Sequence, residues 1–260
     1  MNSIHIKTAE EAKLMRTSGQ LLATVFDALD GFIQVGKSTL EINDFVEDVI
    51  VNKLQARPAS KGQYDYKYVL NCSINEVVCH GVPTPARKLK SGDIVNIDIT
   101  LEKNGFIADS SKMYCIGKVT PVAKKLVDIT YHAMWKGIQV VKPNATTGDI
   151  GHAIQSYVEK YGYSVVREYC GHGIGREMHE APQILHYGSP ATGVVLKEGM
   201  VFTIEPMINQ GTHKTKTKKD GWTVVTRDKK LSAQWEHTIL VTSNGFEVLT
   251  LREGELNPTI

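Results

Sequence analysis

Cysteine is scarce in this sequence, and the spacing of the cysteines argues against two kinds of stabilised scaffold. They form no Cys-x-x-Cys pair, so neither a zinc ribbon nor a disulfide framework is indicated, and we expect reduced, mostly buried thiols at Cys72, Cys79, Cys115 and Cys170. No apolar run reaches the length of about 18 residues that spans a bilayer. The N-terminus also lacks the basic segment followed by an apolar one that marks a secretory signal. The sequence therefore predicts a cytoplasmic protein without membrane contact.

An excess of charge of one sign is also missing. The 30 basic and 28 acidic residues give a formal net charge of +2, which is too balanced to indicate nucleic acid as the main partner. The chain has 260 residues, of which 42% are hydrophobic, so it is long enough to bury a large core as one domain or two.

A predicted β-hairpin between residues 89 and 109 carries two acids. The apolar, mostly β-branched residues of its first strand are Ile94, Val95, Ile97, Ile99 and Leu101, and Asn104-Gly105 is a strong hairpin signal. A two-residue turn there puts Asp98 and Asp109 on one face as diagonal neighbours, about 7–8 Å apart at the backbone. The expected facing pairs are Lys103 with Phe106, Thr100 with Asp109 and Asp98 with Ser111. Both carboxylates then converge on one spot, the alternative being a solvated pair at a sheet edge.

The chain comes close to repeating this stretch. LKSGDIVNID at 89–98 matches LKEGMVFTIE at 196–205, and STLEI at 38–42 matches TTGDI at 146–150. Asp98 and Glu205 occupy equivalent places in the two copies. After each copy a return arm carries another acid: Asp109 in the first, and Glu236 in a second hairpin-like pair over 222–241. An internal duplication would bring the four acids together about a pseudo-twofold axis.

The duplication favours a single domain, 1–260, whose halves cover roughly 1–118 and 119–260 and share a sheet. Capping signals and helical periodicity predict four helices, and the strands mix with them without strict alternation. We therefore predict the α+β class, with a curved, mainly antiparallel sheet covered by helices. The expected helices cover about 8–31, 39–54, 120–142 and 147–160. Further strands are expected at 71–81 and 246–251, and within 165–175, where a strand runs into a glycine-rich turn at His172.

A metal site is the first chemistry that these residues indicate. His172, between glycines in CGHGIG, adds one nitrogen donor to the four acids. One imidazole and four carboxylates suit a pair of divalent ions such as Mn, Fe, Co or Zn, whereas Ca or Mg rarely needs a histidine. Each acid alone is better explained as a solvated or helix-capping carboxylate. The duplicated positions beside apolar strand residues favour a metal site.

Hydrolysis is the reaction that such a site supports. Water between two metals about 3.5–4 Å apart loses a proton near neutral pH and attacks a carbonyl that one metal polarises. A proton shuttle and an oxyanion donor are also needed. We expect Glu205 to be the shuttle and His80 and His179 the donors; a structural role is the alternative for either histidine. Cys79 is discounted as a nucleophile, because adjacent strand residues point to opposite faces.

Seven motifs in order resemble a type I methionine aminopeptidase over essentially the whole chain: NEVVCHGVP, GDIVNIDIT, DSSKMY, CGHGIG, TIEPM, DGWTV and SAQWEHT. The resemblance implies the pita-bread fold, a pseudo-twofold α+β domain around a dinuclear metal site. It also implies removal of the initiator methionine from nascent proteins when the next residue is small. Glu205 would be the base or shuttle, with His80 and His179 at the scissile amide. The implied metal ligands are Asp98, Asp109, His172, Glu205 and Glu236.

The implied methionine pocket departs from the family pattern. A change of one or two methylenes alters discrimination by only about 1–3 kcal/mol, so the strictness of the pocket for methionine stays open. Packing on a strand face is the alternative role for the residues that do not match. Tyr66 and Trp222 match the pattern, whereas Asn71, Met178, Ser60 and Gln63 depart from it.

The basic loop at 212–219, THKTKTKK, is a solvated hairpin tip or, because nascent chains emerge at the ribosome, a contact to ribosomal RNA phosphates. Two readings compete with the main one. A relative that cleaves X-Pro bonds shares the fold and the five ligands but usually carries an additional N-terminal domain, for which 260 residues leave no room. A non-catalytic binding module of this fold typically lacks metal ligands. We expect a monomer that acts on polypeptide N-termini.

Overall fold

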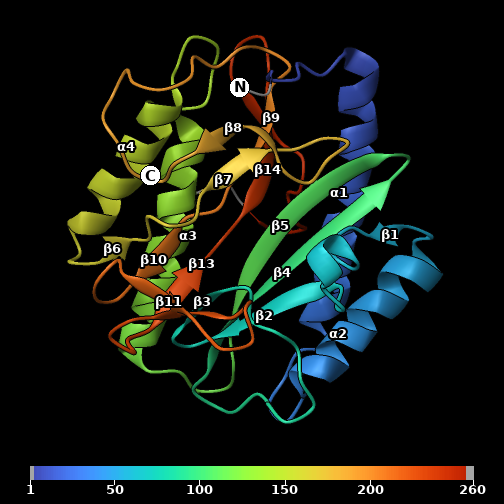
Figure 1. Cartoon of the computed structure of the whole chain (residues 1–260), viewed down its shortest axis with the longest axis vertical. Coiled ribbons are helices and arrows are strands. Elements are labelled where there is room, and N and C mark those ends of the chain that lie inside the picture. Colours follow the sequence, from blue (N-terminus) through green and yellow to red (C-terminus); the bar gives the residue numbers. More distant parts are fainter. Residues whose placement is uncertain (1–2, 256–260) are drawn as a thin grey trace.

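The computed structural model describes residues 3–255. These residues form an α+β fold of mixed helices and strands (Figure 1). The α-helices are α1 (Ala9–Asp30), α2 (Thr39–Asp48), α3 (Pro121–Gln139) and α4 (Thr147–Glu159). The strands of the first half are β1 (Arg57–Pro58), β2 (Leu70–Ile74), β3 (Val77–Cys79), β4 (Ile94–Lys103) and β5 (Phe106–Cys115). Those of the second half are β6 (Ser164–Val165), β7 (Gly171–Gly173), β8 (Glu180–Ile184), β9 (Val201–Ile204), β10 (Met207–Asn209), β11 (Thr215–Thr217), β12 (Val224–Thr226), β13 (Ser232–Gln234), β14 (His237–Val241) and β15 (Phe246–Val248).

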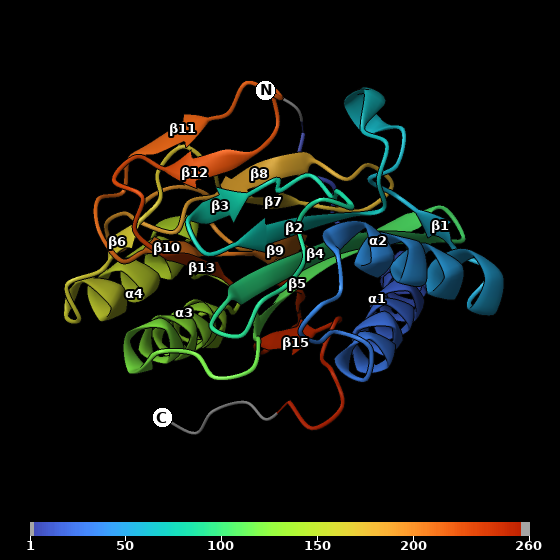
Figure 2. The same ribbon diagram turned by 90° about the horizontal axis from the view of Figure 1, so that it is seen from below.

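The strands form four small antiparallel sheets. In the first, β4 pairs with β1, β2 and β5, and the largest has the order β15-β14-β9-β7-β8. The other two have the orders β13-β10-β6 and β11-β12-β3. Figure 2 shows the helices along one side of the strands, with β3, β8, β11 and β12 on the other side. The helices leave that second side open to the pocket described below.

The predicted helix starts are confirmed. Thr8, Ser38 and Thr146 each form a capping box with the acid three residues later, and Thr120 caps the helix that Pro121 opens. One end differs from the prediction, since α2 passes at Val49–Lys53 into a π-helical turn. The main-chain N–H of Leu54 bonds the carbonyl of Val49, so the apolar stripe continues while the hydrogen bonding widens.

The central hairpin has the predicted register. Asp98 pairs with Ser111 and Thr100 with Asp109 across β4 and β5. Asn104 and Gly105 both take positive φ, at 54° and 78°, as a two-residue turn between right-twisted strands requires. Asp98 and Asp109 consequently share the face that looks toward the second half of the chain.

Equivalent contacts recur in the two halves. Ser38 forms an isolated bridge with Lys88, and Thr146 forms the matching bridge with Val195. Likewise Gly92 and Gly199, both at positive φ, donate their N–H groups to the carbonyls of Ile116 and Val241. The α+β fold class with duplicated halves is confirmed. These paired contacts support our proposal that the halves form one domain.

The prediction of a single strand over 71–81 is wrong. The chain turns between β2 and β3 at Asn75, whose φ is 56°. The turn is fixed by the Asn75 side chain, which donates to Asp93 Oδ1 at 2.8 Å and accepts the N–H of Ile94 at 3.1 Å. No glycine or proline marks this turn, so hydrophobic patterning alone misses it.

Two further strand predictions need correction. Residues 222–241 do not pair as a hairpin: β12 pairs with β11 and β3, whereas the return strand β14 pairs with β9. The stretch 165–175 contributes the end of β6 and all of β7, with residues 166–170 outside any strand. Both errors have one cause, because pairing between strands distant in sequence leaves no local signal.

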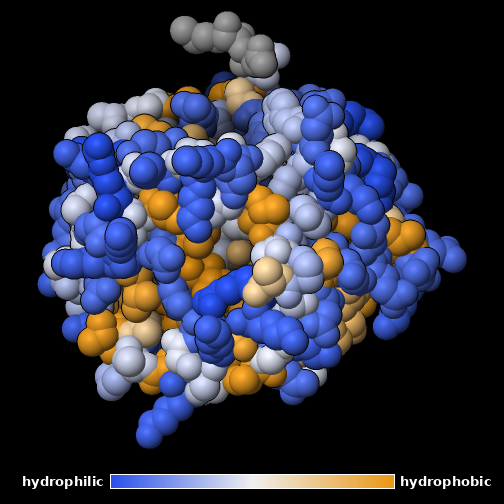
Figure 3. Space-filling view, turned by 60° about the horizontal axis from the view of Figure 1, so that its bottom comes forward, coloured by the Kyte–Doolittle hydropathy of each residue, from blue (hydrophilic) through white to orange (hydrophobic). Residues whose placement is uncertain are grey.

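In each half of the chain, a hydrophobic core packs the helices against the strands that carry the site residues. One cluster joins α1 and α2 to β4 and includes Phe26 and Ile97, and another joins α3 and α4 to β9 and includes Trp135 and Phe202. Figure 3 shows one face of the molecule as mainly hydrophilic, hollowed in the middle, with apolar side chains in separate patches. Across residues 3–255, no helix is both long enough and apolar enough to cross a bilayer.

Candidate metal centre

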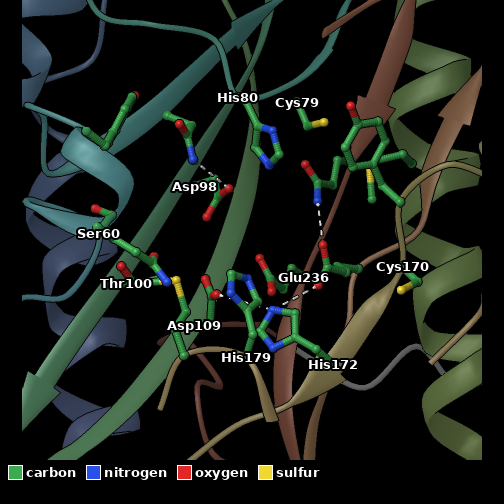
Figure 4. A pocket seen from close by; sticks show the side chains of 18 of the residues that line it. Ser60, Cys79, His80, Asp98, Thr100, Asp109, Cys170, His172, His179 and Glu236 are labelled. Atoms are coloured by element: carbon green, nitrogen blue, oxygen red, sulfur yellow. Dashed lines mark hydrogen bonds and ion pairs between the residues drawn. The ribbon is translucent and has the colours of Figure 1, made fainter. Parts of the chain in front are cut away.

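One cavity of about 570 Å³ holds all of the sequence-predicted site residues. The five candidate ligands reach it from five different elements. Asp98 lies in β4, Asp109 in β5 and His172 in β7, while Glu205 directly follows β9 and Glu236 directly precedes β14. In Figure 4, His80 enters from one side and His172 and His179 from the other, with Asp98, Asp109 and Glu236 between them. The fold thus joins acids that lie up to 138 residues apart in the chain.

His172 presents a free nitrogen to the acids. Its Nδ1 lies 3.1 Å from the carbonyl oxygen of Gly173, which fixes the proton on that nitrogen. Its Nε2 then faces Glu205 Oε1 at 3.5 Å and Asp109 Oδ2 at 3.8 Å. Burial, with the neighbouring His179, lowers the pKa of His172 to about 3. The imidazole is therefore neutral, and its Nε2 lone pair is available to a metal.

The four acids of the cavity form no ion pair with a lysine or arginine among the described residues, so their ionised forms require a bound cation. Burial raises the pKa of Asp98 to about 6 and that of Glu205 to about 8. Burial, followed by the charge of neighbouring acids, raises the pKa of Asp109 and Glu236 well above the ordinary value. Within residues 3–255, no lysine or arginine forms an ion pair with any of the four. Ionised carboxylates so placed are stable only with a cation between them.

The donor set fits a divalent metal. One ligand atom each from Asp109, His172 and Glu236 lies within 4.8 Å of the others. Asp109 Oδ1 is buried and has no hydrogen-bond partner among the described residues. Such an orphaned oxygen is costly unless a cation binds it. A neutral imidazole and several carboxylates together suit Mn, Fe, Co or Zn.

Three residues that the sequence did not single out hold Glu205 in place. Thr203 Oγ1 donates to Glu205 Oε1 at 2.8 Å, and Gln234 Nε2 donates to Glu205 Oε2 at 3.3 Å. The N–H of Glu205 donates to Nε2 of His186, a fully buried imidazole. Thr203 and Gln234 lie within the motifs TIEPM and SAQWEHT, but nothing in the sequence distinguishes their side chains or that of His186 from ordinary packing residues.

His80 and His179 line the cavity beside the acids. His80 takes positive φ at 55° and packs edge-on against Tyr169, with 5.4 Å between ring centroids. His179 packs edge-on against His172 at 4.4 Å. Burial lowers the pKa of both His80 and His179, so both rings are neutral at pH 7 and each keeps one N–H to donate.

A largely buried ion pair fixes the loop that carries His179. Lys7, whose side chain is 1% exposed, pairs with Glu180, and Glu180 Oε1 accepts the N–H of Arg176 at 3.0 Å. Gly175 makes room for this pair, since a Cβ there would lie 2.6 Å from Lys7 Nζ. No local sequence pattern predicts this contact, because Lys7 lies in the segment before α1 and Glu180 lies in the other half of the chain.

Aromatic and sulfur-containing side chains form the outer wall of the cavity. Tyr66 donates its hydroxyl to the carbonyl of Leu70 at 2.9 Å and packs on Trp222, with 4.9 Å between ring centroids. Met178, Asn71, Ser60 and Gln63 line the same cavity. Burial raises the pKa of Cys79 well above the ordinary value and that of Cys170 to about 11, so both remain thiols near neutral pH. Neither is an activated nucleophile.

Comparison with known proteins assigns a family to this geometry. The model of metallopeptidase family M24 matches residues 13–243. A methionine aminopeptidase from Escherichia coli (strain K12) is 51% identical over 258 residues, covering 99% of this chain and 98% of that protein. A crystal structure of methionine aminopeptidase from Rickettsia prowazekii superposes with a TM-score of 0.93 at 50% identity, covering 96% of this chain and 100% of that one. A prolidase from Pyrococcus horikoshii OT3 gives a TM-score of 0.75 at 26% identity, covering 96% of this chain and 65% of that one.

Proposed function

The chain belongs to metallopeptidase family M24, and we propose that it removes the initiator methionine from nascent polypeptides when the second residue is small. The observation that carries the proposal is the joining of five ligand-type residues and two neutral histidines in one cavity of about 570 Å³. Because nascent chains are made in the cytoplasm, we propose that the enzyme acts there and that it is a monomer.

Two divalent ions, drawn from Mn, Fe, Co or Zn, are the cofactors that we propose. Asp98, Asp109, His172, Glu205 and Glu236 would hold them, with the carboxylates ionised and the imidazole neutral. When bound, the metals would polarise the scissile carbonyl and supply an activated water.

Glu205 is the residue that we propose as the proton shuttle. Its carboxyl lies in the cavity with one oxygen accepting from Thr203 and the other from Gln234, so the group is held in one orientation. Burial raises its pKa to about 8 in the metal-free protein, which shows how strongly this environment favours the protonated form. A carboxyl with these properties can take a proton from water and return it to the leaving amine.

His80 and His179 serve in this proposal as hydrogen-bond donors to the substrate. They stand on opposite sides of the acids, as Figure 4 shows, and both are neutral near pH 7. One N–H directed at the scissile amide and one at the developing oxyanion would stabilise the transition state, each donor contributing about 10²–10³ in kcat.

The outer wall of the cavity is the proposed binding site for the methionine side chain. Tyr66, Trp222 and Met178 supply aromatic and thioether surface that suits a long, unbranched thioether. Asn71, Ser60 and Gln63 make the same wall more polar. We expect methionine to be preferred over leucine by a margin of about 1–3 kcal/mol, because the difference is one of packing rather than of hydrogen bonding.

Cleavage of X-Pro bonds is the competing substrate assignment. The P. horikoshii prolidase shares the fold, but the match covers only 65% of its length at 26% identity. The E. coli methionine aminopeptidase is 51% identical and is matched over 98% of its length. The full-length match at twice the identity favours the methionine assignment.

The exposed basic loop supports a second part of the proposal, contact with the ribosome. Lys214, Lys216, Lys218 and Lys219 are exposed on and beside β11, which pairs with β12 at the surface. Mobile ammonium groups on a hairpin tip suit phosphate oxygens, which they bind without sequence preference.

Peptide cleavage tests the proposed function. We would measure methionine release from Met-Ala-Ser, Met-Lys-Ser, Leu-Ala-Ser and Ala-Pro-Ala by the chelator-treated protein, alone and with each metal restored. The expected result is metal-dependent cleavage of Met-Ala-Ser, with Met-Lys-Ser resistant. Cleavage of Ala-Pro-Ala would refute methionine removal in favour of X-Pro cleavage. Inactivity with every metal would refute the proposal that the protein is an enzyme.

A further inference from the structure

The two halves of the chain meet at a short seam beside the candidate metal ligands. β5, which carries Asp109, contacts the segment around Glu236 through one isolated antiparallel bridge between Ser111 and Glu236. The N–H of Glu236 donates to the carbonyl of Ser111 at 3.2 Å, and the N–H of Ser111 donates back at 3.4 Å. Thr238 completes the seam, since its hydroxyl donates to the carbonyl of Asp109 at 2.7 Å and accepts the N–H of Asp109 at 3.1 Å.

The spacing of Asp109 and Glu236 depends on this seam. The two residues contribute ligand atoms to one cluster, yet they belong to different halves and are joined by no continuous ladder. The bridge itself has long hydrogen bonds, and the shorter bonds of Thr238 reach the main chain of Asp109 but not that of Glu236. A further contact to the main chain of Glu236 would add to what holds the two carboxylates at ligand spacing.

Arg252 makes that contact. It follows β15 and sends its guanidinium into the seam, where Nη2 donates to Ser111 O at 2.7 Å and to Ser110 Oγ at 2.6 Å. Nη2 also lies 3.4 Å from the carbonyl oxygen of Glu236, and Ser110 Oγ donates to that same oxygen at 2.7 Å. One guanidinium nitrogen thus binds both strands at the points where they carry Asp109 and Glu236.

The surroundings of Arg252 hold the guanidinium in this one place. Its side chain is 2% exposed, and its other terminal nitrogen, Nη1, donates to both carboxylate oxygens of Glu255 at 3.2 and 3.0 Å. The guanidinium plane packs over the Phe26 ring of α1, with 4.6 Å from Cζ to the ring centroid. Burying a charge in this way is a poor means of gaining stability, since a packed apolar side chain usually does as well. The planar fork instead gives fixed geometry.

We propose that Arg252 is a positioning residue, which holds Asp109 and Glu236 at metal-ligand spacing by joining the main chains that carry them. It touches neither substrate nor metal and acts through Ser110, Ser111 and the carbonyl of Glu236. The inference rests on the proposed function, since it concerns the ligands of the metals proposed there.

Metal affinity is the measurement that tests the role of Arg252. We would titrate Mn²⁺ alone into chelator-treated wild type, Arg252→Lys and Arg252→Met by calorimetry, well below the unfolding temperature. Loss of an outer contact to a ligand typically weakens metal binding by about 10–100-fold, which is the effect expected for Arg252→Met. Arg252→Lys keeps the charge and one donor, so it should recover part of the loss. The absorption spectrum of bound Co²⁺ should change in Arg252→Met as the ligand geometry relaxes.

Arg16→Met is the matched control. Arg16 binds Glu247 of β15 with 2.8 Å between Nη2 and Oε2, so it also fastens the C-terminal strand to α1, but it has no contact with the seam. Mn²⁺ affinity should stay unchanged in this variant. If Arg252→Met does not fold, Ser110→Ala tests the inference in its place. This variant removes only the hydroxyl between Arg252 and the carbonyl of Glu236, and we expect it to weaken Mn²⁺ binding several-fold.

Three results would overturn the inference. The first is an Arg252→Met protein with a lowered unfolding temperature and Mn²⁺ affinity within twofold of wild type, which would leave a purely structural role. Unchanged affinity in Ser110→Ala would contradict it in the same way. A wild-type protein that binds no Mn²⁺ and releases no methionine would overturn the proposed function and this inference with it. If the wild type binds Mn²⁺ and releases methionine while the variants keep wild-type Mn²⁺ affinity, only the inference is overturned.

Discussion

The side-chain amide of Asn71 donates a hydrogen bond to the carboxylate of Asp98, with 3.2 Å between Nδ2 and Oδ2. The two residues face each other across β2 and β4, so the contact follows directly from the strand register. Asn71 also lines the cavity in which the substrate side chain is proposed to bind. One residue therefore belongs to the pocket wall and to the surroundings of a candidate ligand.

Asn71→Ala should weaken metal binding as well as alter the pocket. The hydrogen bond holds the pKa of Asp98 down against the effect of burial, so its loss favours the protonated carboxyl, which binds metal poorly. We expect Mn²⁺ affinity to fall by about 10-fold or more, measured by calorimetry. Gln63→Ala is the control, since Gln63 lines the same cavity and its side chain forms no hydrogen bond with an acid among the described residues. Equal Mn²⁺ affinity in Asn71→Ala and wild type would show that the hydrogen bond has no effect on the metal.

The hairpin of β4 and β5 shows how far the sequence determines this fold. Asn104-Gly105 sets the turn, the turn sets the register, and the register puts Asp98 and Asp109 on one face. The helix starts follow equally from local chemistry, because each capping box is complete within four residues. Local signals therefore suffice wherever a structure is built from neighbours in the chain.

Contacts between the halves are where sequence reasoning fails. The bridge of Ser111 to Glu236 and the pair of Lys7 with Glu180 join residues more than 100 positions apart. Neither contact alters the spacing of apolar residues, so neither can be predicted from hydrophobic periodicity. The duplication predicted that the acids converge, but the residues that hold them together needed the three-dimensional structure.

Lys7→Met should lower turnover without lowering metal affinity. The substitution leaves Glu180 without its cation, and removing one partner of a buried pair costs about 3–5 kcal/mol. The turn over 175–180 would loosen, and His179, next to Glu180, would lose its fixed position beside His172. We expect kcat on Met-Ala-Ser to fall by about 10-fold or more, with Mn²⁺ affinity as in wild type.

The double variant Lys7→Met, Glu180→Gln separates charge from position. The amide of glutamine still accepts the N–H of Arg176 but carries no unpaired charge. Stability and most of the turnover should return. A Lys7→Met protein with wild-type kcat would show that the pair does not position His179.

Charge reversal at the basic loop should release the enzyme from ribosomes. Changing Lys216, Lys218 and Lys219 to Glu replaces three exposed ammonium groups with carboxylates that repel phosphate. Co-sedimentation with ribosomes should fall steeply in the variant, and wild-type binding should fall with rising salt. Cleavage of the free peptide Met-Ala-Ser is the control and should not change. Unaltered co-sedimentation of the variant would exclude this loop as the contact.

The metal-free protein should lose stability as the pH rises from about 7 to about 8, the folded-state pKa of Glu205, and the loss should level off above it. The pKa of Glu205 is about 8 in the folded chain against an ordinary value of 4.5. The folded state therefore binds a proton that the unfolded state has released, and each step upward in pH through this window favours unfolding. The slope for one such group approaches about 1.4 kcal/mol per pH unit. His172 and His186, whose pKa values are lowered to about 3, are uncharged in both states above pH 7 and add no slope.

Urea unfolding of chelator-treated protein across this window measures the effect. The free energy of unfolding should fall with pH in wild type and fall less in Glu205→Gln, which cannot ionise at that position. Saturating Mn²⁺ should reverse the trend, because metal binding requires ionised carboxylates and strengthens as they lose their protons. A metal-free wild type whose stability is constant or rises with pH would mean that Glu205 is already ionised in the folded chain, and the cavity would then have to hold that charge without a metal.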